Sequence, residues 1–297
     1  MASPDNMKVL KKILFAAVAL VVILLAAWFL FVTYYKPPLS DRHGKLDAEL
    51  FLSDSSQRQP MIVAFGGSQG GNTWTADYWA PMRNEFLRQG YAVLSIGYFK
   101  TENTPESLNR ISLNAIYDTI KSMSRHPRID SGKIALLGSS RGGELVLNLA
   151  SRYKDIDAVV ALVPAHATFP AEQSLNTSAW TFNEKEVPHF RISFTSILAS
   201  IVRSKKSAWE NILANELTER NSLIEVEKID GPVLLLSAAD DETWPSQYMC
   251  EQIANRLQEK QFKYYYKHYS FEGGHYDTRK HFDEVFAFLN AHFKQSK

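Results

Sequence analysis

A glycine-bracketed serine pair between an apolar run and a helical pattern constrains this sequence more than any other feature. Residues 133–138 read as a short buried strand, and residues 141–153 have the periodicity of a helix. The junction Gly138-Ser139-Ser140-Arg141-Gly142 matches the pattern G-x-S-x-G. This pattern is typical of a sharp strand-to-helix turn, because a side chain at either glycine would collide with the neighbouring strand or helix.

The same order of strand and helix recurs along most of the chain. The alternation predicts an α/β fold with a mostly parallel central sheet and helices on both faces. One stretch, 166–228, is too long for an ordinary connection and is rich in aromatic residues, so we expect an inserted cap there. The expected strands are 60–66, 91–97, 133–138, 157–163, 232–238 and 262–269, and the clearest helices are 76–88, 105–125, 141–153, 246–259 and 278–294.

The N-terminal region predicts a membrane anchor. Residues 1–12 form a short basic tail, and the twenty residues from Ile13 to Val32 carry no charge. At about 1.5 Å per residue a helix of this length spans about 30 Å of hydrocarbon. A cleavable signal peptide is the alternative, but its apolar part is usually only about 7–15 residues long and is followed by a small-residue cleavage pattern that this sequence lacks.

Charge around the anchor, residues 13–35, predicts its orientation. Lys8, Lys11 and Lys12 precede it, so the N-terminus should be cytoplasmic and the rest of a single-pass protein should lie on the other side of the membrane. Lys36, Arg42 and Lys45 on the far side weaken this bias. After the anchor we expect a linker and first strand at 36–54 and a catalytic domain at 55–297.

Composition excludes several classes of function. The chain of 297 residues has 33 basic and 32 acidic residues, so no broad positive field favours nucleic acid as a partner. Its single cysteine, Cys250, excludes an internal disulfide and a cysteine cluster for zinc. We expect no metal and no organic cofactor.

The serine in the turn gains a chemical interpretation from two other loops. A serine hydroxyl needs a histidine as base and a carboxylate to orient that histidine, and on this type of sheet the order along the chain is serine, acid, histidine. Asp240 and Asp241 follow the strand 232–238, and His275 follows the strand 262–269 after two glycines. We therefore predict Ser140 as nucleophile, His275 as base and Asp241, in preference to Asp240, as acid; a turn without chemistry is the alternative.

Further residues are expected around this nucleophile. An oxyanion needs two N–H donors, and Arg141 would supply the first from the residue after the nucleophile. The second is expected from the loop Gly66–Gly71, with Ser68 favoured and Gly67 as the alternative. The loop matches neither common phosphate-binding glycine pattern. We place His166 and Trp244 among the substrate-binding candidates, although a structural, hydrogen-bonded histidine is the more common role at a position such as His166.

The sequence resembles the C-terminal catalytic domain shared by bile acid-CoA:amino acid N-acyltransferases and acyl-CoA thioesterases, within the α/β-hydrolase superfamily. The likeness covers most of residues 55–295 and rests on "IVAFGGSQGG", "YAVLSIGYF", "HPRIDSGKIALLGSSRGGELVLNLAS", "SAADDETWPS" and "GGHY". It implies Ser140 as nucleophile, Asp241 as acid and His275 as base. It favours Asp241 because in the family the acid lies five residues before the serine matched by Ser246.

The resemblance also implies an activity. Amino-acid-conjugating members use cysteine as nucleophile, so a serine favours transfer of the acyl group to water. We expect a membrane-anchored serine hydrolase acting on acyl esters or thioesters of small molecules or lipids. An acyltransferase with an amine or alcohol acceptor is the first alternative, and a non-catalytic binding protein of the same fold is the second.

Overall fold

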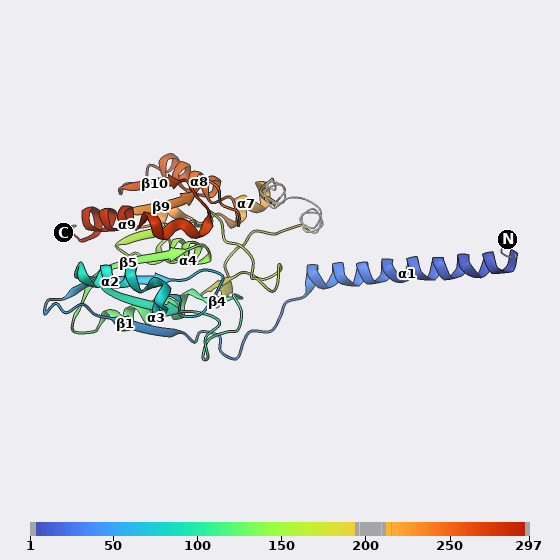
Figure 1. Cartoon of the computed structure of the whole chain (residues 1–297), viewed down its shortest axis with the longest axis horizontal. Coiled ribbons are helices and arrows are strands. Elements are labelled where there is room, and N and C mark those ends of the chain that lie inside the picture. The colour runs from blue at the N-terminus through green and yellow to red at the C-terminus, as the bar shows by residue number, and fades with distance from the viewer. Residues whose placement is uncertain (1–3, 194–195, 197–208, 210–211, 215, 295–297) are drawn as a thin grey trace.

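The protein consists of a globular body and one long helix that projects from it (Figure 1). The computed structural model describes residues 4–193, 196, 209, 212–214 and 216–294. The projecting helix is α1 (Pro4–Tyr34), and its segment Asn6–Phe31 is long and apolar enough to cross a membrane. That segment is not buried against the body, so it is not a core helix.

A seven-stranded sheet forms the centre of the body, in the order β1-β3-β2-β5-β6-β9-β10. All neighbouring strands are parallel except β1, which pairs antiparallel with β3. The ends of the six parallel strands therefore meet along one side of the sheet, which we call the carboxyl edge. The strands are β1 (Asp47–Phe51), β2 (Gln59–Phe65), β3 (Ala92–Gly97), β5 (Ile129–Ser139), β6 (Ala158–Leu162), β9 (Val233–Ala238) and β10 (Tyr266–Phe271).

Two apolar cores cover the two faces of the sheet. Successive side chains of a strand point to opposite faces, so Met61 and Val63 of β2 enter one core while Ile62 and Ala64 enter the other. The first core is completed by helices α3, α4 and α8, and the second by α2 and α9. The bounds of these helices are α2 (Ala80–Arg88), α3 (Leu113–Ser124), α4 (Arg141–Ala150), α8 (Ser246–Glu259) and α9 (Phe282–Leu289).

The α/β architecture matches the expectation, but several boundaries differ from it. The helix expected at 105–125 begins at Leu113, because Ser112 is extended and its hydroxyl accepts the N–H of Ala115 as an N-cap. The strand expected at 262–269 is β10, which starts at Tyr266 because its parallel partner β9 starts opposite it at Val233.

Two other helices are shorter than the pattern indicated, because each is flanked by tighter or wider turns. The helix expected at 76–88 begins at Ala80 after 3₁₀ turns at Thr73–Thr75 and Asp77–Trp79. The helix expected at 278–294 is α9, with a 3₁₀ segment at His275–His281 before it and a π-helical turn at Asn290–Lys294 after it.

The region expected to form a cap, 166–228, contributes two strands to a second, smaller sheet, whose third strand comes earlier in the chain. The strands of this sheet are β4 (Ile111–Ser112), β7 (Trp180–Phe182) and β8 (Lys185–Glu186), in the order β4-β7-β8. Strands of two or three residues are too short to leave a periodic pattern, so the sequence did not predict them. The region also holds the helix α7 (Glu216–Ser222) and a 3₁₀ turn at Val226–Lys228. Between 194 and 215 the structure describes residues 196, 209 and 212–214, so most of this part of the expected cap lies outside the described residues.

Candidate active site

Ser140 occupies a strained turn between β5 and α4. Its backbone has φ 58° and ψ −119°, a region that residues other than glycine rarely adopt. Such a conformation costs on the order of 1–3 kcal/mol and persists only where the surroundings enforce it. The Ser140 N–H donates to the Leu162 carbonyl at the end of β6, 2.8 Å away, which fixes the turn to the neighbouring strand.

The two glycines of the motif are required by close backbone approach. A Cβ at Gly138 would lie 2.1 Å from the carbonyl oxygen of Gly142, and a Cβ at Gly142 would lie 2.3 Å from the carbonyl oxygen of Gly66. Neither backbone group can move aside cheaply. The buried hydroxyl of Tyr98 donates to the same Gly66 carbonyl at 2.7 Å and fixes the strand end beside the turn. Tyr98 was not among the expected site residues, although it lies in the motif "YAVLSIGYF", because its partner is 32 residues away in the chain.

The structure brings Asp241 and His275 into direct contact. Nδ1 of His275 lies 2.8 Å from Oδ2 of Asp241 and 3.0 Å from its Oδ1. Both side chains are at least 95 % buried. Burial acts to raise the pKa of Asp241, but its hydrogen bonds with His275 and Ser246 outweigh burial and hold the pKa below its ordinary value. The neighbouring Asp240 is exposed. Its contact with the His275 loop is made by the backbone, whose N–H donates to the Gly273 carbonyl.

Short-range contacts hold the loop that carries His275. Gly273 has φ +128°, which favours glycine, and the Gly274 N–H donates to the Asp277 carboxylate at 2.9 Å. The His275 N–H donates to Oε2 of Glu242, 3.0 Å away. Glu242 was not among the expected site residues; its place directly after Asp241 is the signal that points to it.

Trp244 links the His275 loop to the strand beside Ser140. Its indole N–H donates to the Val163 carbonyl at 3.1 Å, and its ring centroid lies 6.0 Å from that of His275. Val163 follows Leu162, the residue that accepts the Ser140 N–H. Ser140 and the Asp241–His275 pair thus lie on the carboxyl edge, at the ends of β5, β9 and β10.

The glycine-rich loop after β2 passes next to Ser140. A Cβ at Gly67 would lie 3.0 Å from the Ser140 Cβ and 3.1 Å from the Ser139 carbonyl oxygen. Gly67 is buried and Ser68 is exposed. On the other side, Arg141 is the first residue of α4, where an amide has no acceptor within the helix. The glycine-rich loop and the start of α4 therefore both lie next to Ser140.

A buried contact between an arginine and a carboxyl group lies in the first turn of α4, directly after Ser140. The Arg141 guanidinium is 2.7 Å from the Glu144 carboxylate and also donates to the Pro170 carbonyl. Glu144 in turn accepts from the Trp180 indole at 2.6 Å and from the Phe169 N–H at 3.1 Å. Burial raises the pKa of Glu144 to about 7, although Arg141 acts in the opposite direction. Sequence reasoning did not find this group, because Trp180 is 36 residues away.

His166 forms a second histidine–carboxylate pair rather than an open subsite. It is 2 % exposed, and its Nε2 lies 2.6 Å from Oε1 of Glu219 on α7. The Tyr248 hydroxyl donates to the same oxygen at 3.3 Å. Nδ1 of His166 is buried and has no hydrogen-bond partner among the described residues.

A pocket of about 920 Å³ opens beside Asp241. A volume of this size is typical of small-molecule sites. Its walls are mostly apolar and come from the end of β9, the start of α8 and the cap region. They include Trp209, Leu213, Ala214, Asp241, Trp244, Pro245 and Tyr248.

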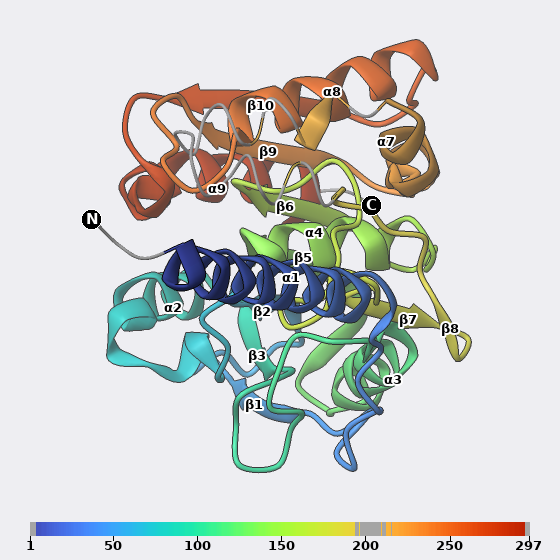
Figure 2. The ribbon, with the colours of Figure 1, turned by 90° about the vertical axis from the view of Figure 1, so that its right-hand side faces the viewer.

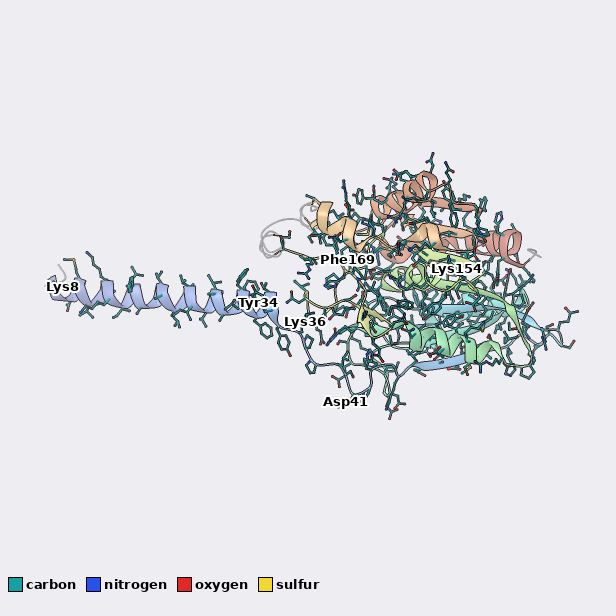
Figure 3. All side chains as sticks on the ribbon, turned by 180° about the vertical axis from the view of Figure 1, so that it is seen from behind. Lys8, Tyr34, Lys36, Asp41, Lys154 and Phe169 are labelled. Atoms are coloured by element: carbon teal, nitrogen blue, oxygen red, sulfur yellow. The ribbon has the colours of Figure 1, made fainter. Side chains whose placement is uncertain are left out.

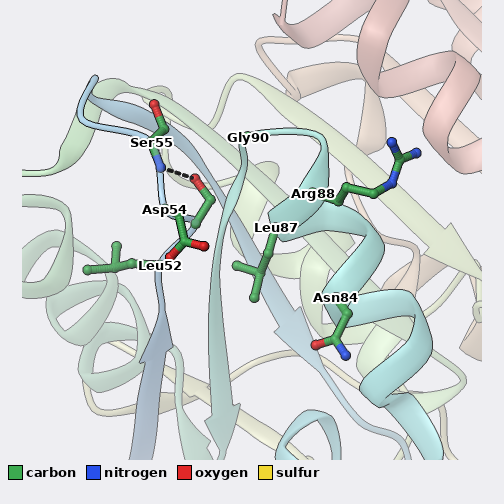
Figure 4. Close-up of a pocket in the computed structure, with 8 residues that line it drawn as sticks. Leu52, Asp54, Ser55, Asn84, Leu87, Arg88 and Gly90 are labelled. Atoms are coloured by element: carbon green, nitrogen blue, oxygen red, sulfur yellow. Dashed lines mark hydrogen bonds between the residues drawn. The ribbon is translucent and has the colours of Figure 1, made fainter.

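A second pocket, of about 550 Å³, is unrelated to this edge. Figure 4 shows it between Leu52–Ser55, which follow β1, and the end of α2 with Gly90. Because β1 is antiparallel and Gly90 precedes β3, this pocket lies at the opposite edge of the sheet. Among the described residues no group of three or more His, Cys, Asp or Glu side chains is placed to hold a metal ion.

Comparisons with known proteins agree with this fold. Residues 111–279 match the family described as "BAAT / Acyl-CoA thioester hydrolase C terminal". Acyl-coenzyme A thioesterase 6 of Homo sapiens is 30% identical over 219 residues, which are 73% of this chain and 48% of the human protein. The chain thus spans about half the length of the curated relatives it matches.

Solved structures show the same fold at low sequence identity. A puromycin-hydrolyzing peptidase of Mycobacterium tuberculosis superposes with a TM-score of 0.60 at 16% identity, covering 84% of this chain and 38% of that one. The alpha/beta hydrolase GrgF from Penicillium sp. sh18 superposes with a TM-score of 0.53 at 15% identity, covering 84% and 99%. The expected α/β-hydrolase fold is confirmed.

Proposed function

Because the chain belongs to the BAAT / acyl-CoA thioester hydrolase C-terminal family, we propose that it is a serine hydrolase that cleaves acyl esters or thioesters. The observation that carries the proposal is the strained Ser140 turn on the same sheet edge as the buried Asp241–His275 pair. A glycine at position 140 would adopt this backbone conformation without strain. The strained serine therefore has no evident role in packing, and such strain often occurs at functional sites.

In the proposed reaction His275 acts as general base. Asp241 holds the Nδ1–H, so that Nε2 takes the proton from the Ser140 hydroxyl as Oγ attacks the acyl carbon. The tetrahedral oxyanion accepts from the N–H of Arg141 and from that of Ser68 or Gly67. Collapse breaks the bond to the leaving alcohol or thiol, which receives the proton from His275. Water, deprotonated by the same histidine, then releases the carboxylic acid and frees Ser140.

The chemistry can be tested by covalent labelling. A fluorophosphonate probe should label Ser140 alone in the full chain, and Ser140→Ala should lose both labelling and hydrolysis of p-nitrophenyl butyrate. Ser139→Ala is the matched control, because the neighbouring serine sits at the end of β5 and should keep both signals. Labelling that persists in Ser140→Ala, with activity, would remove Ser140 from the nucleophile role.

We also propose that α1 anchors the enzyme in a membrane as a single span, with its N-terminus in the cytoplasm and the catalytic domain on the other side. The support is the exposed apolar length of α1 and the three lysines before the apolar run. Protease added outside intact cells should digest the catalytic domain only if this orientation holds. Release of the domain by sodium carbonate, or its protection from protease, would contradict the anchor or the orientation.

A further inference from the structure

The segment that follows α1 is bound to the body rather than free. The Tyr35 carbonyl accepts from the Ser174 hydroxyl at 3.2 Å and from the Asn176 amide at 3.5 Å. Lys36 forms an ion pair with Glu186 of β8 at 3.3 Å. The Arg110 guanidinium donates to the Pro37 carbonyl. We call residues 35–37 the juxtamembrane segment.

The residues that bind this segment also reach the nucleophile turn. Ser174, Asn176 and Glu186 flank the strand β7, and Arg110 immediately precedes β4, the neighbour of β7 in the small sheet. Trp180, the first residue of β7, donates its indole N–H to Glu144 in the first turn of α4. A continuous set of contacts thus joins the end of α1 to the helix that begins at the nucleophile turn.

The carboxyl edge faces the side from which α1 projects. The linker from α1 enters β1 at Asp47, and because β1 is antiparallel to β3 the parallel strands run back toward α1 (Figure 1). Figure 3 shows Phe169, which contacts the first turn of α4, on the side toward Lys36, whereas Lys154, beyond the end of α4, lies farther from α1. In Figure 2, α4 lies just above α1, whereas β7 and β8 lie to its right and α7 lies at the upper right.

We propose that the juxtamembrane segment holds the carboxyl edge against the bilayer, so that the substrate is an acyl lipid that passes from the membrane into the pocket beside Asp241. This inference rests on the proposed hydrolase function. The occupant of the pocket would be the acyl chain, since Trp209, Leu213 and Trp244 form part of its walls. The helix α7 of the cap region lies on the side of the body toward α1 (Figure 1).

The advantage of this arrangement follows from the partition of acyl chains. Each methylene lowers the concentration of a lipid in water about fourfold relative to an apolar phase, so a long-chain ester is almost absent from water. A pocket that meets the bilayer directly takes the chain from one apolar phase to another. A pocket turned toward water would depend on the minute dissolved fraction.

The test compares two esters with the same leaving group in phosphatidylcholine vesicles containing the full chain. p-Nitrophenyl palmitate resides in the bilayer, and p-nitrophenyl butyrate is dissolved in the water. A flexible twelve-residue Gly-Ser insertion between Tyr34 and Tyr35 keeps the anchor but releases the orientation. The same insertion between Asn6 and Met7, on the other side of the apolar run, is the matched control. Rates are normalised to the amount of fluorophosphonate-reactive enzyme.

We expect the insertion after Tyr34 to lower palmitate hydrolysis about tenfold by diluting the productive orientation, with butyrate hydrolysis and the control insertion unchanged. Arg110→Ala should shift the palmitate-to-butyrate ratio in the same direction without altering the anchor. Arg58→Ala removes an exposed arginine at the opposite edge of the sheet and should leave the palmitate-to-butyrate ratio unchanged.

An unchanged palmitate-to-butyrate ratio in both the insertion and Arg110→Ala would overturn the inference and would mean that the substrate arrives from water, while the proposed function would stand. If the unmodified chain did not hydrolyse p-nitrophenyl butyrate, that result would instead contradict the proposed function itself. The two failures are therefore distinguishable.

Discussion

Two buried histidine–carboxylate pairs lie near the carboxyl edge, and they use opposite nitrogens of the imidazole ring. In one, Nδ1 of His275 contacts Asp241 at 2.8 Å, and in the other, Nε2 of His166 contacts Glu219 at 2.6 Å. The shorter contact belongs to His166, whose other nitrogen is buried without a partner among the described residues. The contact distance alone therefore does not distinguish His275, the proposed base, from His166.

What surrounds each pair does distinguish them. Oδ1 of Asp241 also accepts the backbone N–H groups of Thr243 and Trp244, so the carboxylate and the His275 loop are both fixed at the ends of adjacent sheet strands. Glu219 belongs to α7 in the cap region and shares its oxygen with Tyr248. The first pair is built into the sheet edge, whereas the second lies within the cap region and contacts the body through Tyr248 of α8.

The largest expected difference is in turnover. His275→Ala should lower kcat for p-nitrophenyl butyrate by about 10⁶-fold, because loss of the base leaves the serine hydroxyl un-ionised. His166→Ala should lower kcat by less than about tenfold, since that ring acts through packing and one hydrogen bond. Equal losses in the two purified variants, both folded by circular dichroism, would break the distinction between the pairs.

The next largest effect concerns the acid of the first pair. Asp241→Asn should lower kcat by about 10⁴-fold, because the amide keeps the shape but neither fixes the tautomer nor stabilises the imidazolium. The hydrogen bonds that lower the pKa of Asp241 keep it ionised at neutral pH, so the native group is a carboxylate there.

Asp240→Asn is the matched control for Asp241→Asn. The Asp240 side chain is exposed, and the N–H that it donates to Gly273 is retained by asparagine. Its kcat should equal that of the unmodified chain. If Asp240→Asn were the damaging substitution, the acid would have been assigned to the wrong residue.

A third carboxyl, that of Glu144, allows pH effects on folding to be separated from those on the proposed catalytic pair, Asp241 and His275. Burial raises the pKa of Glu144 to about 7, so between about pH 4.5 and 7 the folded chain holds a proton that the unfolded chain has lost. Stability should therefore fall as the pH rises through this window, by up to about 3 kcal/mol at about 1.4 kcal/mol per pKa unit. Glu144→Gln should flatten the decline in unfolding free energy.

The control for this pH effect is Glu259→Gln, which changes an exposed carboxyl at the end of α8. Its pH profile in urea unfolding should follow that of the unmodified chain. If the Glu144→Gln profile did so as well, Glu144 would not hold a proton in the folded state at these pH values.

Local sequence patterns predicted the parts of this molecule whose geometry is decided within a few residues. Strand and helix periodicity gave the central sheet, and the glycines at 138 and 142 indicated the turn because backbone contact leaves no room for a side chain. Asp241 and His275 were expected to act together because each follows a predicted strand in the order serine, acid, histidine, and the structure shows that these two strands, β9 and β10, pair with each other. The catalytic roles of Ser140, Asp241 and His275 stay predictions.

Features decided by distant contacts could not be predicted in this way. Glu144 looks like an exposed helical residue in sequence, and only Trp180, 36 positions away, shows that it is buried. Glu219 lies 53 positions from His166 in a region without a periodic pattern. Helix starts such as Leu113 depend on a cap and on the chain direction before it, so periodicity placed them several residues too early.

The smallest expected effect sharpens the structural role of the second pair. The hydrogen bond with His166 is the main reason that the pKa of Glu219 lies below its ordinary value. The stabilisation is therefore present above about pH 4.5 and is lost as the pH falls through the folded-state pKa. Glu219→Gln should reduce the unfolding free energy by about 1 kcal/mol at pH 7 and by less at pH 4, measured by urea unfolding, with kcat little changed. A large loss of kcat without loss of stability would show that the His166–Glu219 pair takes part in the reaction and is not only structural.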